Sequence, residues 1–107
     1  MKTKLDSMNE KKLSGFLNGK HNKTMLVVEP NNTLIYIDID NENVTLEELQ
    51  RLVDGYIEIY PSNNKYYYYI VDEEGLLKNK PFNLLAKELI NIDAVGTVVM
   101  IPKEFFK

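Results

Sequence analysis

The sequence has no cysteine, a single histidine and no long apolar run, and each absence excludes a class of protein. Without cysteine the chain can form no disulfide framework, thiolate nucleophile or cysteine-ligated metal site. No apolar stretch approaches the roughly 20 residues that a membrane-spanning helix needs. The N-terminal residues also lack the apolar region of a secretory signal. We therefore expect a soluble, cytoplasmic protein without a membrane partner.

Basic residues are scarce relative to acidic ones. The 13 lysine and arginine residues are outnumbered by 16 aspartate and glutamate residues, which gives a net charge of -3. A protein that follows the phosphates of nucleic acid would show a basic surface, so the composition argues against nucleic acid as a partner. The acidic excess is in turn too small to indicate a mimic of DNA.

Residues that commonly carry catalysis are isolated in this sequence. His21 lies in a polar segment, and no second imidazole is present to share a zinc ion with it. The five glycines are scattered and form no phosphate loop, and no serine sits in a nucleophile elbow. We therefore predict a protein that is not an enzyme and holds no metal or cofactor.

One acidic cluster leaves a third functional hypothesis, a metal-dependent hydrolase. Asp72, Glu73 and Glu74 are consecutive, and carboxylates are the ligands that divalent cations prefer. Adjacent side chains of an extended segment point to opposite faces, however, and rarely share one ion. We interpret the cluster as a solvated acidic turn.

The segment Val44–Pro61, VTLEELQRLVDGYIEIYP, has the clearest structural pattern. Thr45 and Glu48 have the spacing of a capping box at the start of a helix. Gly55 is placed to end that helix in the left-handed conformation. Tyr56–Tyr60 then alternates between apolar and polar side chains, as a strand with one buried face does.

The rest of the chain adds four strands and a second helix, for which Asn83 is the expected N-cap. The strands are predicted at residues 24–29, 33–40, 66–71 and 96–101. The order β-β-α-β-β-α-β predicts an α+β fold with a mainly antiparallel five-stranded sheet and two helices packed on one face. Residues 1–23 are expected to form an N-terminal arm, partly helical or disordered, and residues 24–107 a single domain.

The tyrosines, seven in number, are the most informative feature. If the isoleucines of the strands at 33–40 and 56–60 face the helices, the tyrosines between them face away. One alternate pair from Tyr66–Tyr69 joins them, either Tyr66 with Tyr68 or Tyr67 with Tyr69. Tyrosine is enriched at interfaces, although tyrosines also pack against each other across neighbouring strands. The residues predicted to bind a partner or ligand are Tyr36, Tyr56, Glu58, Tyr60, Tyr66, Tyr68, Glu73 and Asn83.

Four short segments together resemble a known family. They are the helix-to-strand stretch from Leu49 to Glu58, DEEGL at 72–76, PFN at 81–83 and VGTV at 95–98. In this order and spacing they resemble the domain of unknown function 3846 family, over roughly Met25 to Ile101. The resemblance implies a small protein of phages, plasmids or conjugative elements, largely of low-GC Gram-positive bacteria, in a family without an established activity.

One residue departs from the family pattern. Members often carry a basic residue directly after the asparagine, where this chain has Leu84. The resemblance then implies that a ligand held by that basic residue is lost or altered here.

Two main hypotheses for the function follow. The first is a non-catalytic binding protein that occupies a surface of a host or element protein, with the family context suggesting a counter-defence inhibitor of the anti-restriction or anti-CRISPR type. The alternative is a small-ligand binder, such as a sponge for a nucleotide signal, with a pocket formed by Asp72–Asn83 and an oligomer interface. Both hypotheses allow a homodimer that forms through the tyrosine face.

Overall fold

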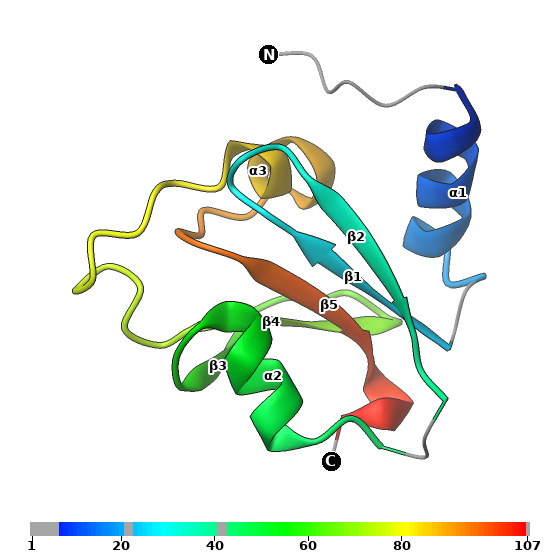
Figure 1. The fold of residues 1–107 in the computed structure, drawn as a ribbon. Coiled ribbons are helices and arrows are strands. Elements are labelled where there is room, and N and C mark those ends of the chain that lie inside the picture. Colours follow the sequence, from blue (N-terminus) through cyan, green and yellow to red (C-terminus); the bar gives the residue numbers. More distant parts are fainter. Residues whose placement is uncertain (1–6, 21–22, 41–42, 107) are drawn as a thin grey trace.

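The computed structural model describes residues 7–20, 23–40 and 43–106, with side chains from Lys11 onward. At its centre is a five-stranded sheet in the order β2-β1-β5-β4-β3 (Figure 1), in which every neighbouring pair is antiparallel. The strands are β1 (Thr24–Val28), β2 (Leu34–Asp38), β3 (Ile57–Tyr60), β4 (Tyr67–Asp72) and β5 (Val98–Pro102). The helices are α1 (Ser7–Leu17), α2 (Leu46–Val53), α3 (Leu84–Ile90) and the short 3-10 helix η1 (Lys103–Phe105). The α+β class and the antiparallel sheet are confirmed, and α1 is present in addition to the two predicted helices.

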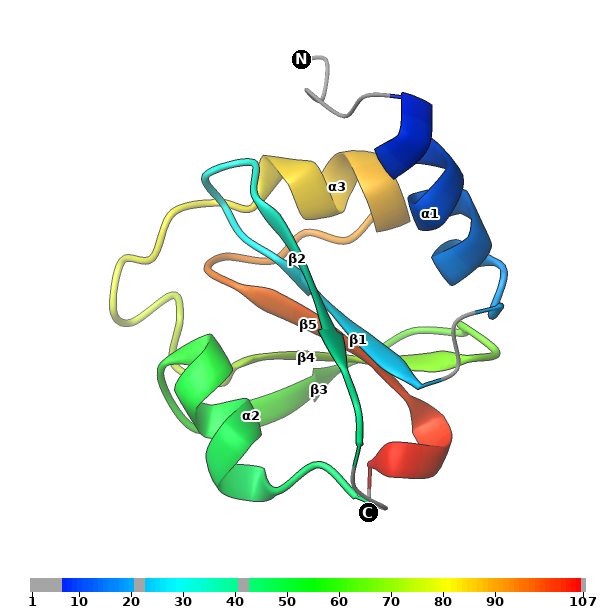
Figure 2. The ribbon, with the colours of Figure 1, turned by 45° about the vertical axis from the view of Figure 1, so that its right-hand side comes forward.

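The prediction that the two helices pack on one face of the sheet is wrong. Leu85 of α3 packs in one apolar cluster with α1, whereas Leu49 and Val53 of α2 pack in a second cluster on the opposite face. Figure 2 shows α1 and α3 on one side of the sheet and α2 on the other. The reason lies in the central strands, because β1 and β5 are buried at every position. Such strands need cover on both faces.

The ends of α2 follow the predicted capping with one change. The hydroxyl oxygen of Thr45 accepts a hydrogen bond from the Glu48 amide at 3.2 Å, as the capping-box spacing predicts. At the other end Asp54, rather than Gly55, takes the left-handed conformation, with φ 58° and ψ 54°. Gly55 is needed for space instead, since a Cβ there would lie 2.5 Å from the Oδ1 of Asp72.

Helices cover the sheet face on which the tyrosines gather, so the expected exposed tyrosine face is not formed. The tyrosines of this face are Tyr36, Tyr60, Tyr67 and Tyr69, and α1 and α3 pack over them. Phe16 of α1 is fully buried and stacks on Tyr67 with ring centroids 4.3 Å apart. The Tyr67 hydroxyl donates to the carbonyl of Phe16. Burial, with a contribution from electrostatic repulsion by Tyr66, raises the pKa of Tyr67 to about 12.

The described part of the predicted N-terminal arm is therefore a helix that packs on the sheet. His21 and the first six residues, which also belong to that arm, lie outside the described residues. Across the described ranges, no helix has both the length and the apolar character needed to cross a membrane.

We expect Phe16→Ala to lower the free energy of unfolding by about 3–4 kcal/mol, because it removes a fully buried ring that stacks on Tyr67. Urea denaturation followed by circular dichroism measures the change. Lys11→Ala on the exposed side of α1 is the matched control, with an expected change below about 0.5 kcal/mol. If the two variants behaved alike, α1 would not contribute to the core.

Candidate functional site

Residues 73–80, here called the projecting loop, follow β4 and extend away from the sheet beside the end of α2 (Figure 1). The loop is built from consecutive turns. Backbone amides bond to carbonyls three to five residues earlier at 3.0 to 3.1 Å, in the pairs Gly75–Asp72, Lys78–Glu74, Asn79–Leu76 and Lys80–Gly75. Its shape is therefore set by its own backbone hydrogen bonds.

A buried carboxylate anchors the projecting loop. The side chain of Asp72 has no exposed surface, and its Oδ2 lies 2.9 Å from the Nζ of Lys78 and 2.7 Å from the Nζ of Lys80. Its Oδ1 accepts a hydrogen bond from the Glu74 amide at 2.9 Å. Three donors from the loop thus converge on one carboxylate at the end of β4.

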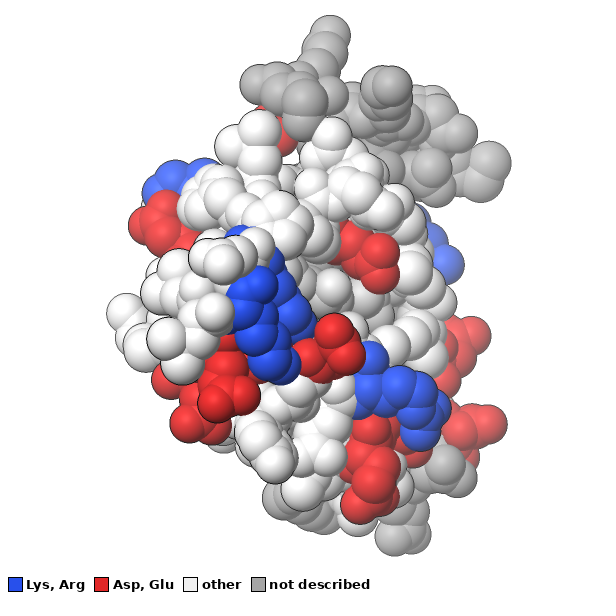
Figure 3. Space-filling view, turned by 60° about the vertical axis from the view of Figure 1, so that its left-hand side comes forward, with Lys and Arg blue, Asp and Glu red and all other residues white. Residues whose placement is uncertain are grey.

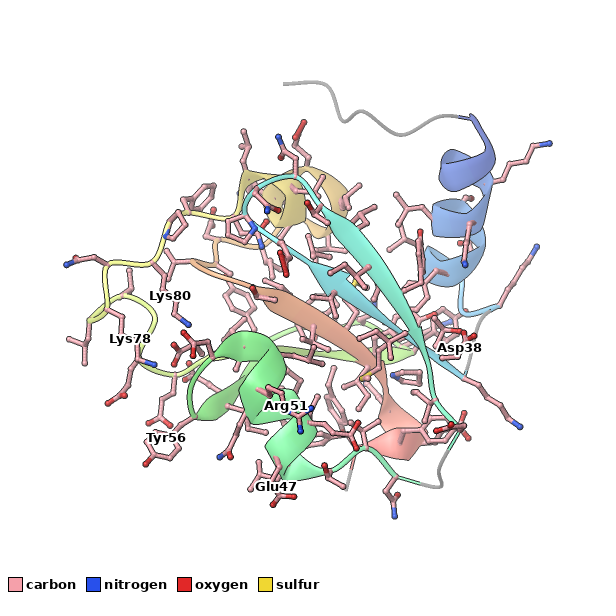
Figure 4. The ribbon with its side chains drawn as sticks, viewed as in Figure 1. Asp38, Glu47, Arg51, Tyr56, Lys78 and Lys80 are labelled. Atoms are coloured by element: carbon pink, nitrogen blue, oxygen red, sulfur yellow. The ribbon has the colours of Figure 1, made fainter. Side chains whose placement is uncertain are left out.

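The same two lysines bind the C-terminal end of α2. Lys80 donates to the carbonyls of Val53 at 2.7 Å and Asp54 at 3.1 Å, and Lys78 donates to Asp54 at 3.0 Å. Figure 4 shows both lysine side chains turned toward this end of the helix. Carbonyls at a helix C-terminus lack intrahelical partners and carry partial negative charge, which favours cations there. The loop, β4 and α2 are therefore joined at one point.

The pKa of the Asp72 carboxyl is low although the side chain is buried. Burial alone would raise this pKa, because it disfavours the charged form. Hydrogen bonds from Lys80, the Glu74 amide and Lys78, with the charge of Lys80, outweigh burial and hold the pKa at about 2. The hydrogen bond to Asp72 in turn raises the pKa of Lys78. The anchor is therefore an ionised carboxylate between two ammonium groups.

Asn83 fixes the chain where it enters α3. Its side-chain amide donates to the carbonyls of Val28 at 2.9 Å and Gly96 at 2.8 Å, and its Oδ1 accepts from the Ala86 amide at 2.9 Å. The predicted N-cap is confirmed. Asn83 was also predicted to bind a partner or ligand. Its side chain is instead fully buried, and its hydrogen bonds are to groups inside the protein.

Between these two fixed points, the projecting loop exposes two adjacent leucines. Leu76 is 79% exposed and Leu77 is 83% exposed. Phe82, which is also exposed, forms a β-bridge with Val95. Single exposed leucines are common on protein surfaces, whereas here two adjacent leucines are exposed on one anchored loop. Figure 3 shows this side of the molecule, where basic and acidic side chains lie next to uncharged surface.

A cleft of about 160 Å³, here called the acidic cleft, lies beside Leu76. Its acidic lining residues are Glu58, Asp72, Glu73 and Asp93, and its apolar ones are Val71, Leu76, Ala94 and Val95. Tyr60 also lines it, and the Tyr60 hydroxyl accepts a hydrogen bond from the Asp93 amide at 3.1 Å. The cleft thus brings together Glu58, Tyr60 and Glu73, which the sequence had suggested as site residues.

The other predicted site residues lie apart from this cleft and from one another. Tyr36 is half-buried under α1, and Tyr68 packs on the opposite sheet face against Phe106, with ring centroids 5.4 Å apart. Tyr56 is 65% exposed next to the end of α2, and Tyr66 is 45% exposed just before β4. These tyrosines do not form the single surface that strand alternation predicted, because the helices cover both faces of the sheet.

Sequence reasoning missed the anchor and the exposed leucines. The interpretation of Asp72 as part of a solvated turn is wrong, since its side chain is buried between two lysines. A signal was present, because the run EEGLLKNK directly after Asp72 places two lysines within eight residues of the carboxylate. The same run places two adjacent leucines in a polar turn. Two adjacent apolar side chains are hard to bury there, which was a signal of their exposure.

The acidic residues do not assemble into a metal centre in the part of the chain that the structure describes. There, no three histidine, aspartate, glutamate or cysteine side chains lie close enough to hold a metal ion. The oxygens of Asp72 are already bonded to Lys78, Lys80 and the Glu74 amide. The hydrolase hypothesis therefore has no ligand set among the described residues.

A comparison with family models identifies the domain. The model described as "Domain of unknown function (DUF3846)" matches residues 23–104. The chain belongs to this family. The resemblance seen in the sequence is thus confirmed, and α1 lies outside the matched residues. No curated protein and no solved structure gives a significant match.

We expect Asp72→Asn to lower the free energy of unfolding by about 2–3 kcal/mol at pH 7. The substitution leaves two ammonium groups without their carboxylate at a partly buried site. Urea denaturation measures the loss, and Glu47→Gln, an exposed carboxylate on α2, is the control.

The same variants test the low pKa of Asp72. The folded pKa of about 2 lies below the value of about 3.9 of an unfolded aspartate. The stabilisation is therefore complete above about pH 4 and is lost as the pH falls toward 2. The free energy of unfolding of wild type and of Glu47→Gln should fall by this contribution between pH 4 and pH 2. Asp72→Asn lacks the carboxyl, so its free energy of unfolding should not show this fall. Equal declines in all three proteins would contradict the anchor.

Proposed function

We propose that the protein is a non-catalytic binding protein that docks on another protein through its projecting loop. The observation that carries this proposal is the exposure of Leu76 and Leu77, at 79% and 83%, on a loop that is fixed at both ends. Covering a leucine side chain contributes about 1.5–3 kcal/mol. Two adjacent leucines therefore offer a partner substantial binding energy from a small contact.

The anchored loop also supports docking on entropic grounds. A segment that is ordered before binding loses little conformational freedom when a partner arrives. Asp72 holds the start of the loop through Lys78 and Lys80, and Asn83 holds the chain after it. The leucines are thus presented in a fixed position.

We also propose that the partner is a protein of a mobile element or of its host. Its support is the phage and mobile-element context that the family resemblance implies. A counter-defence role, in which the loop blocks a working surface of a host protein, is the biological setting that we propose.

We expect Leu76→Ser/Leu77→Ser to abolish partner binding while leaving the fold intact. Both side chains are almost fully exposed, so their replacement should change the free energy of unfolding by less than about 0.5 kcal/mol. Wild type and variant serve as bait in a lysate of a Gram-positive bacterium that carries a family member, with quantitative mass spectrometry of the captured proteins. A partner should be captured at least about tenfold less by the variant.

Leu46→Ser is the matched control, because Leu46 is 52% exposed on α2, away from the loop. It should capture the partner as wild type does. A partner retained by the loop variant, or no specific capture by wild type, would contradict the proposal. Light scattering at two protein concentrations shows whether the partner is a second copy of this chain.

A small-ligand function is the second candidate, favoured by a hollow of about 210 Å³ beside the start of β4, which has room for one part of a nucleotide rather than the whole molecule. It is lined by Tyr66 and Tyr67 together with Lys65 and Lys103. Tyr66 is 45% exposed, and its ring packs closely on Gly19, where a Cβ would lie 2.7 Å from the ring. An exposed aromatic ring in a hollow that two lysines and Glu104 also line offers a stacking surface for the base of a nucleotide and positive charge for its phosphate.

This second candidate predicts that a nucleotide raises the melting temperature by several degrees at a concentration of about ten times its dissociation constant. A thermal-shift screen of mono- and dinucleotides measures this. Tyr66→Ser should remove the shift, and Tyr56→Ser, at a similarly exposed tyrosine elsewhere, should keep it. An unshifted wild-type protein across the screen would exclude this candidate.

A further inference from the structure

The acidic cleft adjoins the exposed leucines, since Leu76 is one of its lining residues. Of its four acidic lining residues, Asp72 is bonded to Lys78 and Lys80 and Asp93 pairs with Lys87 at 3.1 Å. Glu58 and Glu73 are exposed and have no ion pair with any described residue. Within the described part of the chain, no lysine or arginine lines the cleft. The cleft therefore presents negative charge that its own walls do not neutralise.

The size of the cleft suits one side chain rather than a whole small molecule. Its volume of about 160 Å³ lies below the roughly 300–1,000 Å³ of most small-molecule pockets. Val71, Ala94 and Val95 supply apolar wall surface. The Tyr60 hydroxyl oxygen, which accepts from the Asp93 amide, adds a polar atom to this lining. A long side chain with an apolar stem and a polar head matches this lining.

The charge of the cleft selects the head group. A phosphate or carboxylate would be repelled by Glu58 and Glu73. Lysine and arginine lay an aliphatic stem along apolar surface while their charged head reaches polar surroundings. Arginine has the further advantage of five N–H donors, enough to bond two carboxylates at once.

We propose that the projecting loop and the acidic cleft together dock a protein segment that carries an arginine or lysine next to apolar residues. The basic side chain enters the cleft beside Glu58 and Glu73, and the neighbouring apolar residues cover Leu76 and Leu77. This inference rests on the proposed function and adds the chemistry of the partner. The negative charge of the cleft beside the apolar surface of the loop is complementary to a basic residue beside apolar ones.

A displayed library of random 12-residue peptides, panned on the immobilised full chain, tests the inference. Wild type is compared with Glu58→Gln/Glu73→Gln, which removes charge from the cleft, and with Leu76→Ser/Leu77→Ser, which removes the apolar contact. Wild type should enrich peptides in which arginine or lysine adjoins leucine, isoleucine, phenylalanine or methionine. The cleft variant should lose the basic preference, and the loop variant should lose the enrichment.

The affinity of one enriched peptide separates the two contacts. Replacing its arginine by citrulline, which keeps the shape and removes the charge, should weaken binding to wild type about tenfold. The same replacement should weaken binding to Glu58→Gln/Glu73→Gln by less than about threefold. Glu47→Gln/Glu104→Gln, with the same change in net charge at exposed sites on α2 and η1, should behave as wild type.

The outcomes distinguish this inference from the proposed function. Enriched peptides that are apolar without a basic residue, and that the loop variant fails to bind, would overturn the inference and leave the proposed function standing. Enrichment of acidic peptides would overturn the inference as well. Peptides that bind the loop variant equally, or no enrichment on wild type, would overturn both.

Discussion

The ionised carboxylate of Asp72 constrains the molecule where a strand, a loop and a helix meet. A buried charge is stable only when opposite charges and hydrogen bonds compensate it. The chain meets this demand by returning Lys78 and Lys80 to Asp72, and their remaining donors cap α2. Leu76 and Leu77 lie between β4 and these lysines and face outward. The backbone hydrogen bonds of the loop and the anchor at Asp72 together hold the leucines in that position.

The sheet itself explains why helices are needed on both sides. One row of apolar residues crosses all five strands, in the order Ile35, Val27, Val99, Ile70 and Ile59. The three central members are buried, while Ile35 and Ile59 at the two sheet edges remain 40% and 43% exposed. Helix α2 covers the centre of this row, and α1 and α3 cover the reverse face. The core is therefore two apolar layers that share one sheet.

Local patterns predicted the parts of this fold that depend on local chemistry. The cap at Thr45 and the existence of strand β3 were readable because they rest on residues a few positions apart. The burial of β3 does not alternate as predicted, because Ile59 is 43% exposed at the sheet edge and Tyr60 packs against the core. Strands whose residues are buried at every position, such as β1 and β5, show no alternation that would indicate which face each helix covers. The cleft escaped prediction for a related reason. Glu58, Glu73 and Asp93 come from three separate segments, and antiparallel pairing with the return of the chain after α3 brings them together.

Helix α1 completes the core although it lies outside the residues that match the family model. Phe16 lies ahead of the matched residues 23–104, yet its ring packs between Tyr36 and Tyr67 at the centre of one apolar layer. A relative that lacks this helix must close the same space with other atoms, such as larger residues at those two positions or a segment of a neighbouring molecule. Presence of the helix and side-chain size at positions 36 and 67 should therefore co-vary through the evolution of the family.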